Sequence, residues 1–404
     1  MNALLLRVFI PFALGNVLGA FYRTVMAVLA PELVEDLSLS AEDLGLLTSV
    51  YFLIFAAAQL PMGVLLDRYG ARLVTTATFA IGGVGCLVFA LSQGMTLLGF
   101  GRALMGLGMS VALMGGFKAM ADWLPREKIA FGNGIILMAG GLGSMTATLP
   151  VQFALSFTDW HGVIIGLGLA TFAVAVIVFC IAPEKPRETS ARSLAEAWRG
   201  LRDIFTSRAF VANAPLGGIT MGISMSVNNL WSGPWLHDVM NVPRGEVAQI
   251  LLGNAAMMTV AVFFTGSIVE RLARAGIPIL TTACLGIACF IAMQGVLIAN
   301  PAVSPYAIWL PLAFLGTIPV LIYTVLTHSF AHALAGRVNT AYNFVVFVVG
   351  FAAQWSIGAI IDLWPPVAEG RFASEGYRTA LAVMVCFEIA AFAWLLLAHR
   401  RKIA

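Results

Sequence analysis

Charged side chains are scarce in this sequence. Asp, Glu, Lys and Arg make up 11% of its 404 residues, whereas an ordinary soluble domain contains about 25%. Apolar residues make up 60% and a further 40 residues are glycine, so a soluble fold would expose too much apolar surface to water. The composition excludes an ordinary cytosolic enzyme, a nucleic-acid-binding protein and a disordered chain. It leaves an integral membrane protein, and a net charge of +3 indicates no electrostatic partner.

Residues for disulfide, metal or nucleotide chemistry are also few. The five cysteines, at positions 86, 180, 284, 289 and 386, lie in apolar runs without CxxC or Cys/His ligand spacing. We expect buried packing residues and no disulfides. His328 and His332 have the i, i+4 spacing of a metal pair but no third ligand nearby, so no metal is expected. The chain has no G-x-x-x-x-G-K-[S/T] run, which argues against ATP as its energy source. No cofactor is expected.

Long apolar runs are what the sequence has in abundance. Runs of about 18 or more residues, broken by charged or turn residues, predict twelve membrane spans. The first six are 8–30, 44–66, 73–93, 96–121, 131–153 and 162–182, and the second six are 210–236, 247–268, 277–299, 305–330, 338–361 and 379–398. We therefore predict an all-α membrane protein with a six-helix bundle over 1–182, a basic cytoplasmic linker over 183–209 and a second six-helix bundle over 210–404.

Positive charge predicts the orientation of these spans. If the N-terminus lies inside, the inner loops and termini hold 17 of the 23 basic residues, and the outer loops hold only Arg244, Arg371 and Arg378. Inner loops of membrane proteins carry such an excess of Lys and Arg. We expect a multi-pass protein of the inner (cytoplasmic) membrane with both termini in the cytoplasm.

Two inner loops repeat one pattern. The loop after the second span reads G-V-L-L-D-R-Y-G-A-R from Gly63 to Arg72, and the loop after the eighth reads G-S-I-V-E-R-L-A-R from Gly266 to Arg274. Both contain a glycine, three residues, an acid and an arginine, followed by a second arginine. A six-span half that occurs twice is the repeat pattern of a transporter.

The first loop resembles the signature G-x-L-x-D-R-x-G-x-R of the major facilitator superfamily, and residues 100–108, F-G-R-A-L-M-G-L-G, resemble the family's R-x-x-x-G-x-G signature. The resemblance implies two pseudo-symmetric six-helix bundles around a central cavity, and a transporter rather than an enzyme. It also implies that Gly63 permits close helix contact between the halves and that loop charges form inner-side contacts which break and reform as the halves rock. The residues with this expected gating role are Gly63, Asp67, Arg68, Arg72, Glu270 and Arg271. A solvated loop with topogenic charge is the alternative for the first loop.

The fifth span departs from two subfamilies. Drug/proton antiporters of the superfamily usually carry G-P-x-x-G-G there, whereas this span reads M-A-G-G-L-G-S-M-T-A-T-L-P from Met138 to Pro150. Its glycine cluster resembles nitrate carriers, which bind anion with arginines on spans 2 and 8. Neither span has an arginine in its membrane portion here. Nitrate is therefore rejected, and drug antiport is disfavoured but stays open.

Three cations lie within predicted spans: Arg23 in span 1, and Arg102 and Lys118 in span 4. A charge at a helix centre costs about 2.5–3.5 kcal/mol, and the family resemblance places both spans beside the cavity. Asp122 offers Lys118 an i, i+4 partner, but no acid is near either arginine in sequence. We hypothesise that a substrate carboxylate, sulfonate or phosphate supplies the missing charge, with Arg23 as the main anchor. Backbone or water partners for the arginines, and snorkelling of Lys118 to the inner rim, are the alternatives.

Neutral polar and aromatic residues complete the candidate substrate site. They are Asn16, Tyr22, Tyr51, Asn228, Asn229, Trp231, Tyr323, His328, Asn343 and Gln354. Helix–helix hydrogen bonding or packing explains each of them equally well. In the outer part of span 7, Gly233-Pro234 predicts a kink or break.

The sequence thus predicts a monomeric secondary transporter that moves a small organic anion by alternating access, coupled to H⁺. It predicts the lipid bilayer and a small-molecule substrate as partners, and no nucleic acid. Glu388, Asp122 and His328 are the candidate coupling groups, and the sequence does not choose among them. An exporter of amphiphilic compounds or drugs is the alternative within transport. A membrane enzyme or receptor is the alternative from another class.

Overall fold

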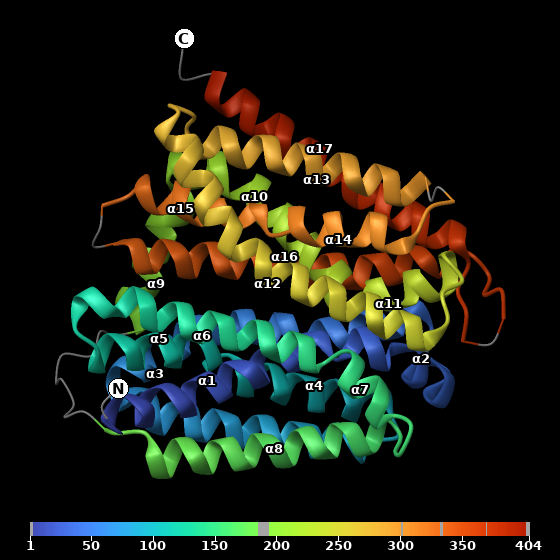
Figure 1. Cartoon of the computed structure of the whole chain (residues 1–404), viewed down its shortest axis with the longest axis horizontal. Coiled ribbons are helices and arrows are strands. Elements are labelled where there is room, and N and C mark those ends of the chain that lie inside the picture. Colours follow the sequence, from blue (N-terminus) through green and yellow to red (C-terminus); the bar gives the residue numbers. More distant parts are fainter. Residues whose placement is uncertain (1–2, 185–193, 300–301, 332–333, 369, 401–404) are drawn as a thin grey trace. The chain divides into compact units, whose positions relative to one another are not determined.

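The structure is a computed structural model that describes residues 3–184, 194–299, 302–331, 334–368 and 370–400 (Figure 1). Residues 185–193 of the predicted linker lie outside this description. The chain forms two compact units: unit 1 is Met1–Leu37 with Leu47–Ala197, and unit 2 is Ser38–Leu46 with Trp198–Ala404. The short stretch 38–46 therefore packs within unit 2, although the sequence around it belongs to unit 1.

Unit 1 is built from helices whose backbone groups bond within each span, which is what a bilayer demands. The helices are α1 (Ala3–Thr24), α2 (Met26–Leu37), α3 (Ala41–Ala90), α4 (Met95–Met109), α5 (Ala112–Trp123), α6 (Arg126–Thr146), α7 (Leu149–Ala154) and α8 (Trp160–Ile181). Helix α9 (Leu194–Thr206) follows, in the predicted linker. Helix α1 contacts α6, α5 and α8, so it lies among the other helices of its unit.

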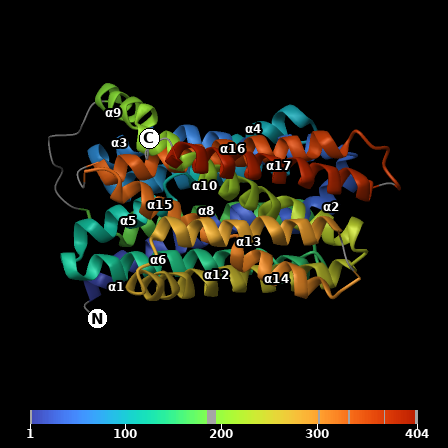
Figure 2. The same cartoon turned by 90° about the horizontal axis from the view of Figure 1, so that it is seen from above.

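Unit 2 continues the helical pattern. Its elements are α10 (Arg208–Ser226), η1 (Val227–Trp231), α11 (Ser232–Pro234), η2 (Trp235–Val239), α12 (Arg244–Arg274), α13 (Ile279–Ala299), α14 (Pro305–Leu315), η3 (Ile318–Val320), α15 (Leu321–His328), α16 (Ala335–Ile361) and α17 (Ser374–Arg400). Helices α12 and α14 run side by side (Figure 2). Helices α10, α13 and α17 share a packed core formed by Leu216, Ile287, Ala391 and Leu395.

The described residues contain eleven helical stretches that are long and apolar enough to cross a membrane. One of them, Ala41–Ala90, holds two predicted spans, 44–66 and 73–93, and breaks between them at Gly70 with φ 81° and ψ 161°. Only glycine takes this backbone conformation without strain, so the loop signature places its glycine at the turn between two spans. The twelve predicted spans are therefore all present as helix, and the all-α membrane class is confirmed.

Span 7 is irregular where the sequence predicts a kink. Two π-helical turns, Val227–Trp231 and Trp235–Val239, flank the short α11 that contains Pro234. Proline lacks the backbone N–H that a regular helix would bond, so the chain widens its turns there. Extra-wide turns of this kind often mark functional sites in helices.

The cysteine prediction is wrong for most of the set. All five thiols are free, as expected, but only Cys86 is buried. Cys180, Cys289 and Cys386 are exposed and Cys284 is half-exposed. A membrane span can expose apolar side chains at no cost because lipid tails are as apolar as the protein interior, so an apolar run does not imply burial.

Candidate functional site

Two arginines of unit 1 approach one tyrosine. The guanidinium carbon of Arg102 lies 5.1 Å from the ring centroid of Tyr51, within the range of a cation–π contact. Arg102 is only 2% exposed, and its Nη2 donates to the carbonyl of Thr48 at 3.4 Å. Its Nε is buried and has no hydrogen-bond partner. Arg102 is therefore a buried cation that α3 only partly satisfies.

Arg23 reaches the same tyrosine from α1. It lies in the last turn of α1, which ends at Thr24, and its side chain is partly exposed. Both arginines interact electrostatically with the Tyr51 hydroxyl, which is buried and lacks a hydrogen bond of good geometry. Within the described residues, ion pairs occur at Lys118 and Arg72 but none at Arg23 or Arg102. The cluster thus combines two positive charges with no carboxylate.

Lys118, the third intramembrane cation, has its counter-charges inside unit 1. Its Nζ lies 3.4 Å from Asp122, which confirms the predicted i, i+4 pair, and 3.5 Å from Asp67 of the loop signature. Asp67 and Lys118 therefore link the loop to the end of α5. Lys118 differs in this respect from the arginine pair, because a substrate anion would compete with two carboxylates for it.

Two predicted substrate contacts instead hold helices together. The Tyr22 hydroxyl is fully buried, 2.8 Å from the Thr171 hydroxyl and 3.0 Å from the Cys86 sulfur. Asn16, 4% exposed, donates to the carbonyl of Ile136 at 2.7 Å. Both side chains join α1 to neighbouring helices, which is the alternative that their sequence positions left open.

The predicted polar residues of unit 2 divide into two groups. The Tyr323 hydroxyl donates to Asn343 Oδ1 at 2.8 Å, and the two side chains are partly exposed. Trp231 is 2% exposed and its indole donates to the backbone carbonyl of Gln354 at 3.1 Å, so it is a packing residue. Gln354 is equally buried. Tyr323 and Asn343 are therefore better placed to meet a ligand.

The other unit 2 candidates are more dispersed. Asn228 donates to the carbonyl of Ser224 one turn earlier, at 2.8 Å, and Asn229 is partly exposed. His328 is exposed at the last residue of α15, while residue 332, which has the i, i+4 spacing to it, lies outside the described residues. No group of three His, Cys, Asp or Glu that could hold a metal occurs in the described part of the chain.

The loop residues expected to act in gating form contacts within their own units. Arg72 lies 3.7 Å from Glu184 and 4.9 Å from the Phe179 ring centroid, and Arg68 lies 5.3 Å from the ring centroid of Tyr69. In the repeated loop, Glu270 pairs with Arg274 at 3.8 Å. Arg271 is exposed.

Gly63 has open space around it. A Cβ atom added there would meet no atom within 4 Å, and its expected contact between the two halves stays a prediction. The residue is only partly buried. Gly106, from the second signature, is one of several glycines of unit 1 that a neighbouring helix approaches closely, because an added Cβ would lie 2.5 Å from the Tyr51 carbonyl oxygen.

Two buried polar side chains of unit 2, Gln294 and Asp238, escaped the sequence predictions. Gln294 on α13 donates to Glu388 on α17 at 2.6 Å, with the two side chains 2% and 0% exposed. Asp238, with a side chain 4% exposed, accepts from the Tyr377 hydroxyl at 2.7 Å and lies 3.7 Å from Arg371. In the sequence, Gln294 stands out as a lone amide in an apolar span and Asp238 as an acid at a span end. Neither pattern shows which residue is the partner.

Comparison with known proteins explains this arrangement of spans and signatures. The family model of the Major Facilitator Superfamily matches residues 12–354. This chain belongs to the major facilitator superfamily. The described residues contain several helices long and apolar enough to cross a membrane, in agreement with this family.

Relatives within the superfamily have different named cargoes. The chain is 26% identical to the hexuronate transporter of Escherichia coli K12 over 168 residues, which are 41% of this chain and 39% of the relative. It is 26% identical to the multidrug resistance protein MdtL of Escherichia fergusonii over 239 residues, 58% of this chain and 59% of the relative. The matches thus span less than two thirds of either relative. A bacterial homologue of the human lysosomal transporter Spinster, solved in an inward-facing unoccupied conformation, is similar in fold, with TM-score 0.79, 20% identity and coverage of 97% and 96%.

Proposed function

We propose that this protein is a secondary transporter of a small organic anion, such as a carboxylate, a sulfonate or a phosphate ester. The observation that carries the proposal is the pair Arg23 and Arg102 beside the buried Tyr51 hydroxyl, which has Arg23 as its polar neighbour, with no ion pair at either arginine in the described residues. A buried cation without a partner is costly. An anion would give both guanidinium groups their missing charge and would accept from the hydroxyl.

The two arginines have different roles in this proposal. Arg23 is partly exposed in the last turn of α1, so it is the residue that can contact a ligand. Guanidinium groups bind carboxylates and phosphates through two parallel hydrogen bonds. Arg102 is almost fully enclosed. It adds positive potential to the site and holds the Tyr51 ring in place.

The names of relatives support an anionic cargo without deciding it. Hexuronates are sugar acids, and one relative is named a transporter of them. Another relative is named a multidrug resistance protein, which keeps export of amphiphilic compounds as a competing function. The two functions differ in what Arg23 must do, because an uncharged drug needs no fixed cation.

Direct transport assays separate these functions. Purified protein in liposomes is tested for uptake of radiolabelled hexuronates, other carboxylates, sulfonates and sugar phosphates. We expect uptake of at least one class, roughly 100-fold weaker in Arg23→Ala and partly restored in Arg23→Lys, because charge-assisted hydrogen bonds are strong and guanidinium geometry is specific. Arg7→Ala is the matched control, since Arg7 is an exposed arginine on the same helix.

Two results would contradict the anion assignment. One is wild-type uptake by a correctly inserted Arg23→Ala protein. The other is transport of uncharged amphiphiles that no anion inhibits, which would establish the export function instead.

For energy coupling we propose symport with H⁺, and Glu388 is the candidate whose surroundings best suit a proton-carrying group. Asp122 is paired with Lys118 and His328 is exposed, whereas Glu388 is fully buried beside one amide and has no cation within salt-bridge distance in the described residues. Low-dielectric surroundings favour the neutral acid. We expect Glu388→Gln to abolish accumulation driven by a pH gradient while substrate exchange at equal concentrations continues. Accumulation at the wild-type level would exclude Glu388.

The orientation stays a proposal that rests on the excess of basic residues in the loops predicted to lie inside. Both termini would then lie in the cytoplasm of a bacterial cell. Labelling of single engineered cysteines by a membrane-impermeant reagent in intact cells tests it. Residues near Arg244 should be labelled and residues near Arg274 should not.

A further inference from the structure

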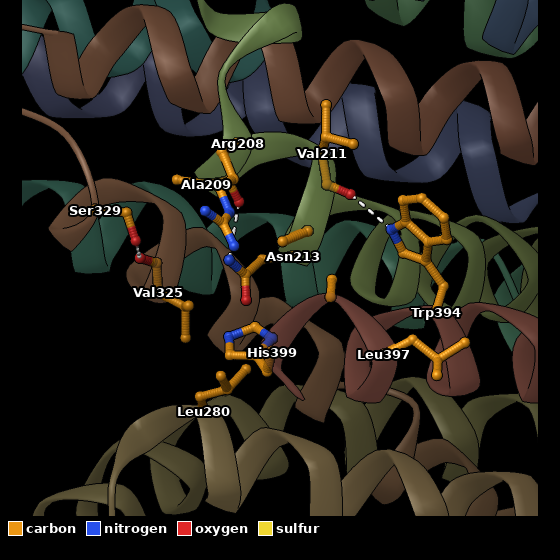
Figure 3. A pocket seen from close by; sticks show the side chains of 12 residues that line it. Arg208, Ala209, Val211, Asn213, Leu280, Val325, Ser329, Trp394, Leu397 and His399 are labelled. Carbon is orange, nitrogen blue, oxygen red and sulfur yellow. Dashed lines mark hydrogen bonds between the residues drawn. The ribbon is translucent and has the colours of Figure 1, made fainter. Parts of the chain in front are cut away.

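Unit 2 contains a cavity of about 520 Å³ at one end of its helices. The first turns of α10 and α13 and the last turns of α15 and α17 enclose it, with Arg208, Asn213, Leu280, Val325 and His399 among its lining (Figure 3). Because these are the ends of four spans, the cavity lies at the level of a membrane surface. It lies within unit 2 and does not involve the Arg23 cluster.

One wall of the cavity is apolar and faces outwards. Val211 is 41% exposed, Trp394 is 47% exposed and Leu397 is 57% exposed. On a membrane span, such side chains contact lipid. The Trp394 indole donates to the carbonyl of Val211 at 2.9 Å, so this wall has a fixed shape (Figure 3). Tryptophan is enriched at the boundary between lipid tails and headgroups, which agrees with the position of the cavity at the span ends.

The other part of the cavity is polar and positively biased. Arg208 is exposed at the first residue of α10, and His399 lies near the end of α17. The Nδ1 atom of His399 lies 3.0 Å from the carbonyl of Leu395 and so must carry the hydrogen, which leaves Nε2 for another partner. None of the twelve lining residues is Asp or Glu. The positive end of the α10 dipole adds to this potential.

A buried acceptor in the lining has no partner. Asn213 is 6% exposed, and its Nδ2 donates to the carbonyl of Ala209 at 2.8 Å. Its Oδ1 has no hydrogen-bond partner and points toward the His399 ring in Figure 3. A buried acceptor without a donor costs about 1–3 kcal/mol, so a bound molecule that donates a hydrogen bond to Asn213 Oδ1 would be favoured.

We propose that this cavity binds the headgroup of an anionic phospholipid. The phosphate lies against Arg208, and the glycerol hydroxyls of the headgroup donate to Asn213 Oδ1 and to His399 Nε2. An acyl chain follows the exposed wall of Val211, Trp394 and Leu397. Basic pockets between spans at the cytoplasmic surface are suited to such headgroups. The lipid-facing wall favours a phospholipid over a free phosphate ion, because only a phospholipid has an acyl chain that can contact that wall.

The test measures lipid binding to the detergent-purified full chain by native mass spectrometry and by thermal shift. Phosphatidylglycerol is compared with phosphatidylcholine of the same acyl chains and with inorganic phosphate. We expect phosphatidylglycerol alone to bind and to raise the melting temperature. Arg208→Gln should weaken that binding roughly tenfold, because it removes a charged hydrogen bond, and His399→Gln should weaken it because it removes the Nε2 acceptor. Arg202→Gln is the control, since Arg202 is an exposed arginine of the adjacent α9 outside the cavity lining.

Four outcomes would overturn the proposal: equal binding of the two phospholipids, an equal effect of inorganic phosphate, an equal loss in Arg202→Gln, or wild-type binding by both cavity variants. Melting temperatures without added lipid show whether each variant is folded. If Arg208→Gln is unfolded, His399→Gln decides alone. The measurement involves no transport, so its result is independent of the organic-anion function.

Discussion

Gly106 on α4 and Tyr51 on α3 touch through their backbones. A Cβ atom at Gly106 would lie 2.5 Å from the Tyr51 carbonyl oxygen and 3.1 Å from its Cα, well inside van der Waals contact. This close approach places Arg102, one turn before Gly106, against the Tyr51 ring. The glycine of the second signature therefore has a structural reason here: it sets the spacing of the two helices that carry the candidate site.

Gly106→Ala should therefore destabilise unit 1. Because backbone atoms oppose the new methyl group, α3 and α4 must separate, and overpacking of this kind costs about 1–3 kcal/mol. The melting temperature in detergent should fall, and uptake should fall with it. Gly99→Ala on the same helix is the control, because an added Cβ there meets nothing within 4 Å and alanine favours the helix. If both variants melt alike, the backbone contact is not tight.

Gln294→Leu should destabilise unit 2 more than Glu388→Gln. The leucine removes the amide that donates to Glu388 at 2.6 Å, leaving a fully buried acid without this partner, at a cost of about 1–3 kcal/mol. The glutamine at 388 keeps an acceptor for the same amide. Thermal melting of the two variants measures the difference. The pair is not a stabilising contact if Gln294→Leu melts at or above the temperature of Glu388→Gln.

Asp362 should stabilise the start of α3. Its two carboxylate oxygens accept from the backbone N–H groups of Ala41 at 3.0 Å and Glu42 at 2.7 Å, and the Ser40 hydroxyl accepts from the N–H of Asp43 at 3.1 Å. These are first-turn donors that the helix itself cannot satisfy. Asp362→Ala should lower stability by about 1–2 kcal/mol, with Asp362→Asn between it and wild type. Hydrogen exchange at residues 41–46 measures the fraying directly and should stay unchanged if the cap is dispensable.

Asp159 should make stability depend on acid pH. It precedes α8, and its carboxylate accepts from the backbone N–H of Gly162 at 2.9 Å, which lowers the pKa of this exposed carboxyl below its usual value. A depressed folded-state pKa means that the contribution is complete above the unfolded pKa, about 4, and is lost as the pH falls through the folded pKa. The melting temperature of Asp159→Asn should therefore fall less steeply below about pH 4 than that of the wild type. Identical slopes would contradict this role.

Local patterns in the sequence predict much of the fold. Each predicted span is helical because an apolar run of sufficient length has no other way to satisfy its backbone in lipid. Pro234 in span 7 predicts the irregular turns found there, and Lys118 with Asp122 predicts their ion pair because i, i+4 spacing is a property of one helix. These features are local, so no knowledge of packing is needed.

The candidate site could be predicted only in part. Arg23 and Arg102 stand out as cations in apolar runs, but their common contact with Tyr51 depends on how three helices are rotated against one another. In the sequence, Tyr22 is an equally good candidate for a substrate contact, but its hydroxyl bonds to Thr171, 149 positions away. An apolar, nearly uniform span carries no clear period to show which side faces inwards.

The sequence by itself determined that the protein lies in a lipid bilayer, how many spans it has and which superfamily its loop signatures resemble. Hydropathy, charge bias and residue spacing are properties of the chain and need no knowledge of its packing. Only the tertiary structure decided which polar groups meet. Gln294 and Glu388 are 94 positions apart, and Asp362 lies 321 positions from Ala41. In an apolar surrounding a polar group must find a partner, but which partner it finds is decided by the packing of helices that lie far apart in the chain.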